Sequence, residues 1–261
     1  MTATVLERDS DGHQSRGSGR IGPSRAWLGR ARAIAGGSLH PPIATAALIA
    51  AVVASAVHFH VFQHELDLEP TYQWGFSGSG LLAGGWTTLA SSQFLTRDVF
   101  MAVSIPMSLV VMLGSYEALR GTTRTVIVAV TSALAGPGLV TAGLGVGSAL
   151  QIEFASRTLE TLDYGASAMT AGGAGALVAV VRNRWLNRGA VAFVMSGLVV
   201  HHELADWEHF VAFPVGFALG RLLDLWHPIA RRRAGTERRP STRGSRVLAV
   251  AVIVAASACG W

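Results

Sequence analysis

The sequence predicts an all-α membrane protein. Of its 261 residues, 50% are hydrophobic and only 14% are charged. This composition excludes disorder for most of the chain and is typical of integral membrane proteins. Apolar stretches long enough to span a bilayer recur along the chain, and arginines gather in every second polar segment between them. The single cysteine, Cys259, excludes an intramolecular disulfide and a cysteine-based metal cluster.

The predicted membrane-spanning helices follow from the lengths of the apolar stretches. A helix needs about 20 apolar residues to cross the hydrocarbon, and somewhat fewer inside a bundle. Six stretches meet this requirement: 43–62, 99–119, 125–150, 164–182, 207–226 and 246–259. Residues 186–201 are a shorter stretch that we also predict to be helical. Residues 74–95 are apolar but interrupted by glycines, which favours a loop dipping into the membrane interface.

The polar ends of the chain complete the predicted domain organisation. Residues 1–42 are rich in Gly, Ser and Arg and are predicted to be a disordered cytoplasmic tail. Residues 43–226 form the membrane domain, and residues 227–245 form a basic cytoplasmic linker. Residues 246–261 then form a C-terminal transmembrane helix.

The arginines predict the orientation of the helices. With the N-terminus in the cytoplasm, 19 of the 21 arginines lie in inner segments. The outer loops hold only Arg97 and Arg157, together with 10 of the 16 acidic residues. This is the positive-inside pattern, so the net charge of +5 follows from topology and indicates no nucleic-acid partner. The expected location is the plasma membrane as a multi-pass protein, with the lipid bilayer as partner.

This topology places a serine and a histidine at similar depth. Ser167 lies near the outer end of the predicted helix 164–182, and His209 near the outer end of 207–226. Gly175 accompanies the face below Ser167, and the glycines Gly216 and Gly220 lie below His209. Faces with small side chains let membrane helices approach closely, as a serine–histidine hydrogen bond requires.

Here the chain resembles the rhomboid intramembrane serine proteases. "GASAMTAGGAGA" is similar to the family's G-x-S-G motif and supplies Gly165 and Ser167, with Gly172 and Gly175 at the family's spacings. "HFVAFPVGFALG" supplies the histidine and glycines of the sixth helix, namely His209, Gly216 and Gly220. "GGWTTLASSQFLTRDVFM" looks like the first loop, and "GSYEALRG" like the motif G-x-x-E-x-x-x-G with Glu117.

The resemblance implies a rhomboid-like six-helix transmembrane bundle plus one C-terminal helix. It implies a protease that cleaves transmembrane substrates with a Ser167–His209 dyad and without a cofactor. Rhomboid proteases usually carry a histidine and an asparagine that hold the oxyanion, but the matching positions here are Met101 and Ile105, which donate no hydrogen bond. The remaining candidates for support of the oxyanion are Gly165 and Ser104.

Three alternatives remain open at the level of sequence. The first is an inactive rhomboid-like protein that binds transmembrane helices. The second is a metal-dependent hydrolase with ligands in "HHELADWEH", all at one membrane surface. Its candidate ligands are His201, His202, Glu203, Asp206, Glu208 and His209. The third is a helical assembly in which Ser167 merely bonds a backbone carbonyl. Glu117 is interpreted as a structural partner of Arg120 or Arg124.

Overall fold

The computed structural model describes residues 40–181, 184–200 and 203–225, which belong to one compact unit that begins at His40. The predicted linker 227–245, the predicted helix 246–259 and nearly all of the predicted tail lie outside these residues. The described residues are mostly helical, as the sequence predicts.

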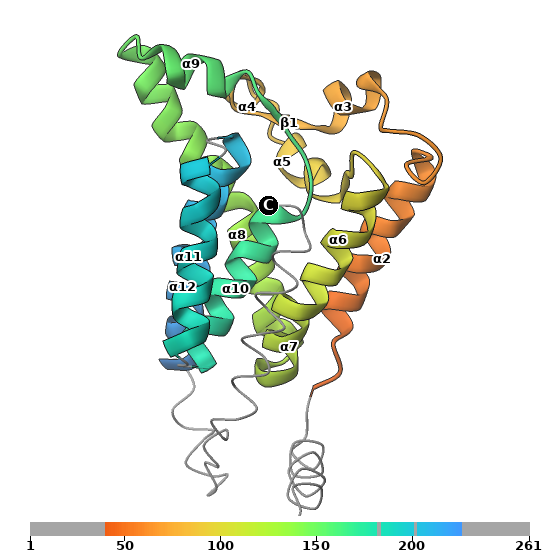
Figure 1. Ribbon diagram of the computed structural model, residues 1–261, viewed down its shortest axis with the longest axis vertical. Coiled ribbons are helices and arrows are strands. Elements are labelled where there is room, and N and C mark those ends of the chain that lie inside the picture. Colours follow the sequence, from red (N-terminus) through yellow and green to blue (C-terminus); the bar gives the residue numbers. More distant parts are fainter. Residues whose placement is uncertain (1–39, 182–183, 201–202, 226–261) are drawn as a thin grey trace, which may run out of the picture. The chain divides into compact units, whose positions relative to one another are not determined.

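Long helical segments run alongside one another and make up most of the fold (Figure 1). They are α2 (Ile43–His58), the continuous run of α6 (Val99–Leu109), η2 (Val110–Gly114) and α7 (Ser115–Arg120), α8 (Thr122–Ala149), α10 (Ser167–Val181), α11 (Arg184–Val200) and α12 (Leu204–Leu225). The segment η2 is π-helical, so the run from Val99 to Arg120 changes register after Pro106.

Short elements gather at one end of these helices (Figure 1). Between α2 and α6 lie α3 (Leu68–Trp74), β1 (Phe76–Ser77), α4 (Gly78–Leu82), α5 (Thr88–Ser91) and η1 (Ser92–Phe94). Between α8 and α10 lie α9 (Glu153–Leu159) and β2 (Leu162–Asp163). The strands β1 and β2 pair antiparallel, with Phe76 opposite Asp163. The region 74–95, predicted as a loop, is therefore a chain of short helical turns that is tied to the segment before α10.

The helix bounds differ from the predicted ones where the backbone leaves helical geometry. The first helix ends at His58 because His60 has a φ of 56°. Helix α10 begins at Ser167 instead of residue 164, because Gly165 has a φ of 110°. Helix α12 begins earlier than predicted, at Leu204, and the side chain of Asp206 accepts a hydrogen bond from the Glu203 N–H at 3.1 Å in its first turn.

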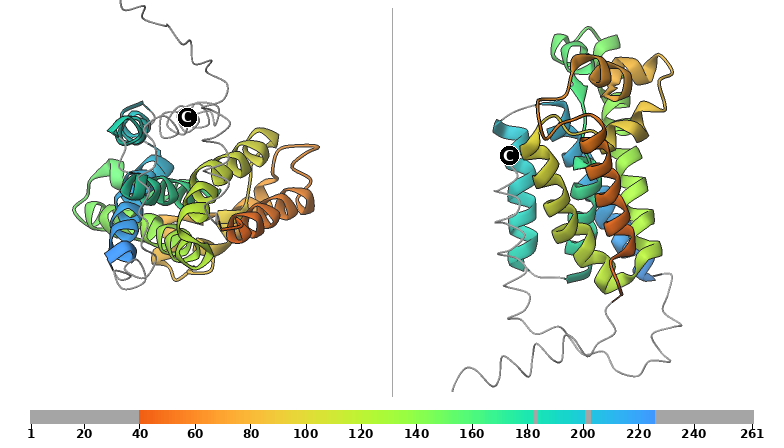
Figure 2. Two further views of the ribbon diagram at one scale, coloured as in Figure 1. Left: turned by 90° about the horizontal axis from the view of Figure 1, so that it is seen from below. Right: turned by 90° about the vertical axis from the view of Figure 1, so that its right-hand side faces the viewer.

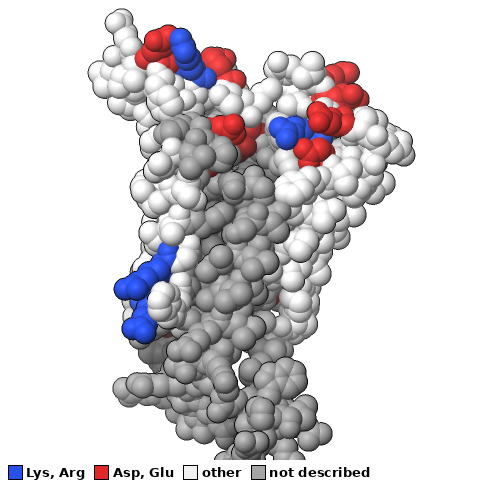
Figure 3. All heavy atoms as spheres, viewed as in Figure 1, with Lys and Arg blue, Asp and Glu red and all other residues white. Residues whose placement is uncertain are grey.

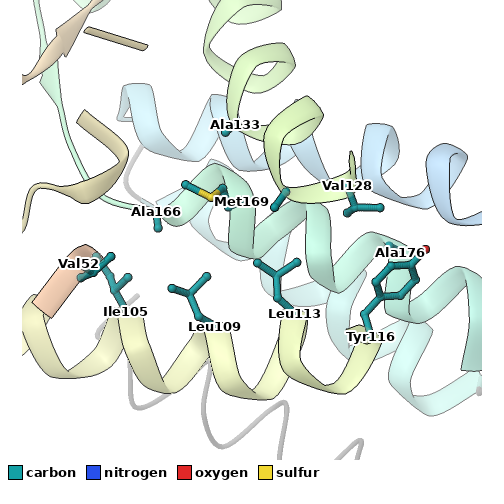
Figure 4. Packing of buried hydrophobic residues seen from close by; sticks show 11 residues of the cluster. Val52, Ile105, Leu109, Leu113, Tyr116, Val128, Ala133, Ala166, Met169 and Ala176 are labelled. Atoms are coloured by element: carbon teal, nitrogen blue, oxygen red, sulfur yellow. The ribbon is translucent and has the colours of Figure 1, made fainter. Parts of the chain in front are cut away.

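The core lies around α10. This helix packs against α12, α8, η2, α11, α6 and α7, and both views in Figure 2 show it among the other helices. Buried residues occur on all its faces, as expected for a central helix. In Figure 4, Ile105, Leu109 and Leu113 point from α6 and η2 toward Met169 and Ala176 of α10. The burial of these apolar side chains fixes α10 between the first and last helices.

The carboxylate of Glu117 caps the N-terminus of α2. It accepts hydrogen bonds from the Ala44 N–H at 2.8 Å and the Thr45 N–H at 2.9 Å. The hydroxyls of Thr45 and Thr122 also donate to it, at 2.7 and 2.8 Å. Helix N-termini carry unsatisfied N–H groups and favour a negative charge. The predicted pairing of Glu117 with an arginine is therefore wrong, because a helix end supplies the compensating dipole.

The two arginines predicted as partners of Glu117 form ion pairs with Asp224 instead. Arg120 and Arg124 contact the carboxylate of Asp224 at 2.9 and 3.3 Å. This joins the end of α7 and the start of α8 to the last turn of α12.

The lengths of the helices test the membrane prediction. Two described segments are long and apolar enough to cross a bilayer, Val99–Arg120 and Thr122–Ala149, while Ile43–His58 and Ser167–Val181 are apolar but shorter. Seven spans were predicted, so two of them qualify by length and composition in the part of the chain that is described. In Figure 3, acidic side chains gather at the end carrying α3 and α9, and a group of arginines lies toward the opposite end of the helices.

Candidate active site

A turn at Gly165 delivers Ser167 to the start of α10. Gly165 has a φ of 110°, which L side chains rarely adopt. Its N–H donates to the carbonyl of Ser92 at 2.8 Å, which fixes the turn to η1. A Cβ on Gly165 would lie 3.0 Å from Ile105 Cδ1 and 3.2 Å from Met101 Cε. The predicted glycine is thus required by backbone conformation and by its close contact with α6.

Ser167 is the first residue of α10 and is half-buried. Its Oγ is buried and makes no hydrogen bond to any residue that the structure describes. The hydroxyl therefore bonds neither His209 nor a described backbone carbonyl, although its side chain stands at the end of a helix. A buried hydroxyl without a partner leaves hydrogen-bonding capacity for another group.

Helices α10 and α12 are in direct backbone contact. A Cβ on Gly216 would lie 1.9 Å from the carbonyl oxygen of Gly172, and one on Gly220 would lie 3.0 Å from the Cα of Ala176. Both pairs have the same offset of 44 residues, so the two helices run parallel in register. Small residues permit this approach, as expected from membrane helix packing.

The remaining predicted glycines extend this contact. A Cβ on Gly175 would lie 2.0 Å from the carbonyl oxygen of Phe213 and 2.8 Å from the N atom of Phe217. A Cβ on Gly172 would also meet Ser132 Oγ of α8 at 1.9 Å. The structure therefore brings together all four glycines predicted for helix packing, and a side chain at any of these positions would press α10 and α12 apart.

The register places Ser167 and His209 at similar height. The offset between the helices sets Ser167 level with the residue two positions after His209, roughly 3 Å along the axis. A Cβ on Gly136 of α8 would lie 3.4 Å from the Cβ of Ala168 and 3.3 Å from that of Ala212, so three helices converge at this level. His209 is buried, with 4% of its surface exposed.

The side of the site that faces α6 is apolar. Met101 and Ile105 both contact the Gly165 turn, so the two positions that lack a hydrogen-bond donor do face the segment before Ser167. Ser104 is buried on the same helix, one residue before Ile105. Positions 101 and 105 share one helix face, and position 104 lies on the adjacent one. Ser104 is therefore less favourably placed than either of them to donate to an oxyanion.

Several polar groups near the turn were not identified from the sequence. Gln93 and Thr96 are buried next to the Ser92 carbonyl that holds Gly165, and neither Gln93 Oε1 nor Thr96 Oγ1 has a hydrogen-bond partner among the described residues. The only signal in the sequence is their place in the stretch "GGWTTLASSQFLTRDVFM", which does not indicate burial.

Two carboxyl groups also meet beside the site. The carboxyl group of Asp163, in β2, lies within hydrogen-bonding reach of Glu208, the residue before His209 on α12. Glu208 is completely buried. Burial raises the pKa of Asp163 to about 6, and the nearby charges of Glu203 and Asp206 add to this effect.

The alternative metal site depends partly on His201 and His202, which lie outside the described residues. Among the residues that are described, no group of three or more His, Cys, Asp or Glu side chains is placed to hold a metal ion. The acidic side chains of this segment have other roles, since Asp206 caps the start of α12 and Glu208 contacts Asp163.

Comparison with known proteins gives no relative: no protein-family model, curated protein or solved structure matches the chain.

Proposed function

We propose that this protein is a rhomboid-type intramembrane serine protease that cleaves transmembrane substrates with Ser167 as nucleophile and His209 as general base. The observation that carries the proposal is the backbone contact between α10 and α12, which holds both residues near one level. A buried hydroxyl without a partner among the described residues and a buried histidine on the neighbouring helix fit nucleophile–base chemistry.

In this mechanism Ser167 Oγ attacks the carbonyl carbon of a substrate peptide bond. His209 accepts the hydroxyl proton and donates it to the leaving amine, and water then hydrolyses the acyl-enzyme. Hydrogen bonds between nucleophile and base are often long without substrate and shorten in the complex. The N–H groups of Ser167, Ala168 and Met169 at the start of α10 have no carbonyl one turn before them in the helix, whereas the N–H of Thr170 donates to the Ala166 carbonyl. The first three are therefore available as backbone donors to the oxyanion.

The contacts of Met101 and Ile105 predict a slow enzyme. In place of polar donors, α6 presents two apolar side chains to the Gly165 turn. Loss of one oxyanion donor typically lowers kcat by about 10²–10³. The rate is then limited by stabilisation of charge in the transition state, and not by substrate binding.

The orientation belongs to the same proposal. The end with α3, α9 and most acidic residues faces outward, and the arginine-bearing end faces the cytoplasm, as the positive-inside rule requires. The site then opens at the outer leaflet of the plasma membrane. An N-terminal tag should be inaccessible to reagents outside intact cells, and its labelling from outside would contradict this orientation.

A fluorophosphonate probe tests the nucleophile without knowledge of the substrate. The purified protein should be labelled by displacement of fluoride at phosphorus by Ser167 Oγ, whereas Ser167→Ala and His209→Ala should not be labelled. Ser156→Ala is the matched control, because that hydroxyl contacts Ser148 and the Ile152 carbonyl at the junction of α8 and α9. Cleavage of a reporter transmembrane helix in liposomes should follow the same pattern, with no effect of EDTA.

A second candidate function is a rhomboid-like protein that binds transmembrane helices without cleaving them. It is favoured by the apolar contacts of Met101 and Ile105 with the Gly165 turn. Ile105→Asn or Met101→His decides between the two candidates, since a restored donor should raise kcat with little change in KM. If wild type and both variants fold but are neither labelled nor active, the binding function replaces the enzymatic one.

A further inference from the structure

The carboxyl groups of Asp163 and Glu208 have no role in the dyad, yet each belongs to a residue close in sequence to one member of it. Asp163 is four residues before Ser167, and Glu208 is the residue before His209. No N–H or O–H group of the described residues donates to either oxygen of Glu208, whose side chain is completely buried. The carboxyl group of Asp163, on strand β2 beside α12, lies within hydrogen-bonding reach of it.

Two ionised carboxylates cannot form a hydrogen bond with each other, because both are acceptors only. Two unpaired negative charges in a buried position are also strongly unfavourable. One proton held between the oxygens removes both problems, since the protonated carboxyl donates to the ionised one. Carboxylate pairs that share a site titrate in this coupled way.

Among the described residues, the elements packed against the pair supply no cation to replace the proton. The acidic residues Glu203 and Asp206 lie on the same side of the pair and make a second negative charge less favourable. The strand β1 offers only Phe76 and Ser77, and helices α8 and α10 carry no titratable residue beyond Arg124 at the far end of α8.

The basic side chain that contacts Tyr164, the residue after Asp163, is engaged in an ion pair of its own. The guanidinium of Arg97 forms an ion pair with Asp98 at 3.1 Å and a hydrogen bond with Tyr164, the residue after Asp163. His209 follows Glu208 on α12 and is the remaining titratable group of this helix turn.

We propose that Asp163 and Glu208 share one buried proton, and that this proton fastens strand β2, and with it the Gly165–Ser167 turn, to helix α12. The bond joins segments that are 45 residues apart and complements the glycine contacts further down the two helices. The proposal goes beyond the proposed function, because it holds whether or not Ser167 is a nucleophile.

The sign of the pH dependence follows from Asp163. Its pKa in the folded protein, about 6, is above its ordinary value of 3.8. The folded state therefore binds the proton more tightly than the unfolded state, and the stabilisation is lost as pH rises through about 6. The apparent Tm of the full-length protein in detergent should fall by several degrees between pH 5 and pH 8.

Two variants test whether the Asp163–Glu208 pair is the source of the pH dependence of Tm. Glu208→Gln keeps the shape and donates an N–H to Asp163 without a bound proton, so the fall of Tm over this range should be largely lost. Glu203→Gln is the matched control: this acid lies near Asp163, but its side chain is exposed, and the fall should remain. An unchanged pH dependence in Glu208→Gln would overturn the proposal, as would a wild-type Tm that does not change from pH 5 to pH 8.

Two further measurements keep the test informative if a variant fails to fold. Infrared difference spectra of the wild type between pH 5 and pH 8 should show loss of the C=O band of a protonated carboxyl, and the band should be absent in Asp163→Asn. A missing band in the wild type would overturn the proposal. Calcium chloride and EDTA should leave the Tm unchanged at pH 8. A large rise with calcium would mean that a cation, and not a proton, joins the two carboxylates.

Discussion

The contact between Gly216 and Gly172 gives the sharpest prediction for the fold. In Gly216→Ala the new methyl group would lie 1.9 Å from the carbonyl oxygen of Gly172, whereas ordinary contacts begin at 3.4 Å. Helices α10 and α12 must therefore separate by about 1.5 Å, the difference between these values. The clash is with backbone, so no side-chain rotation relieves it.

The expected loss of stability in Gly216→Ala follows from two opposing effects. Overpacking of this kind costs about 3 kcal/mol. Replacement of glycine by alanine within a helix returns up to about 1 kcal/mol. Gly216→Ala should therefore destabilise the protein by about 2 kcal/mol. A displacement of this size between the proposed nucleophile and base should also lower the rate of probe labelling by about 10².

The assay is unfolding in mixed micelles by SDS titration, followed by circular dichroism. Gly143→Ala is the matched control, because a Cβ at this position of α8 meets no atom within 4 Å. It should be neutral or stabilising by up to about 1 kcal/mol. If Gly216→Ala were as stable as Gly143→Ala, the backbone contact between α10 and α12 would be wrong.

Three further predictions use the same unfolding assay. Glu117→Gln should lower the free energy of unfolding by about 3 kcal/mol, since the amide loses the charge and one acceptor for the hydrogen bonds at the start of α2. The exposed Glu160→Gln is the control, and equal stability of the two variants would contradict the cap. Asp224→Asn should lower the free energy of unfolding by only about 1 kcal/mol, and by less at high salt, because Arg120 and Asp224 are each about one-fifth exposed. A loss of stability that salt does not reduce would contradict the ion pair. Gly165→Ala should destabilise the protein by about 2 kcal/mol through its positive φ. The same change in an Ile105→Ala background should destabilise that variant further, because loss of the closest contact does not relieve the backbone strain.

The helices were predictable because their apolar stretches are long and separated by charged segments. The glycines of α10 and α12 were predictable for a related reason, since small residues at helical spacing have few other uses in a membrane helix. The start of α10 was not, because the positive φ of Gly165 depends on the contact with Met101 and Ile105 from α6. Helix propensity and hydropathy do not predict a contact between residues that are distant in the sequence.

The polar partners were the least predictable part of the site. Glu117 and Arg120 are three residues apart on one helix, a spacing typical of an ion pair. Their actual partners, the start of α2 and Asp224, lie 73 and 104 residues away in the chain. Likewise, Asp163 and Glu208 meet only because β2 lies beside α12. Such pairings depend on the three-dimensional arrangement, which a single sequence does not encode locally.

The cap formed by Glu117 also has a consequence for the order of assembly. The amide groups that it satisfies are synthesised 72 and 73 residues before it, so α2 waits for its cap until α7 has been made. Without the N–H groups of α2, the carboxylate of Glu117 would be costly to bury, because a charge without partners is strongly unfavourable in an apolar medium. We therefore expect the segment from α2 to the start of α8 to assemble as the first unit during synthesis. The helices that carry Ser167 and His209 would then dock onto this scaffold.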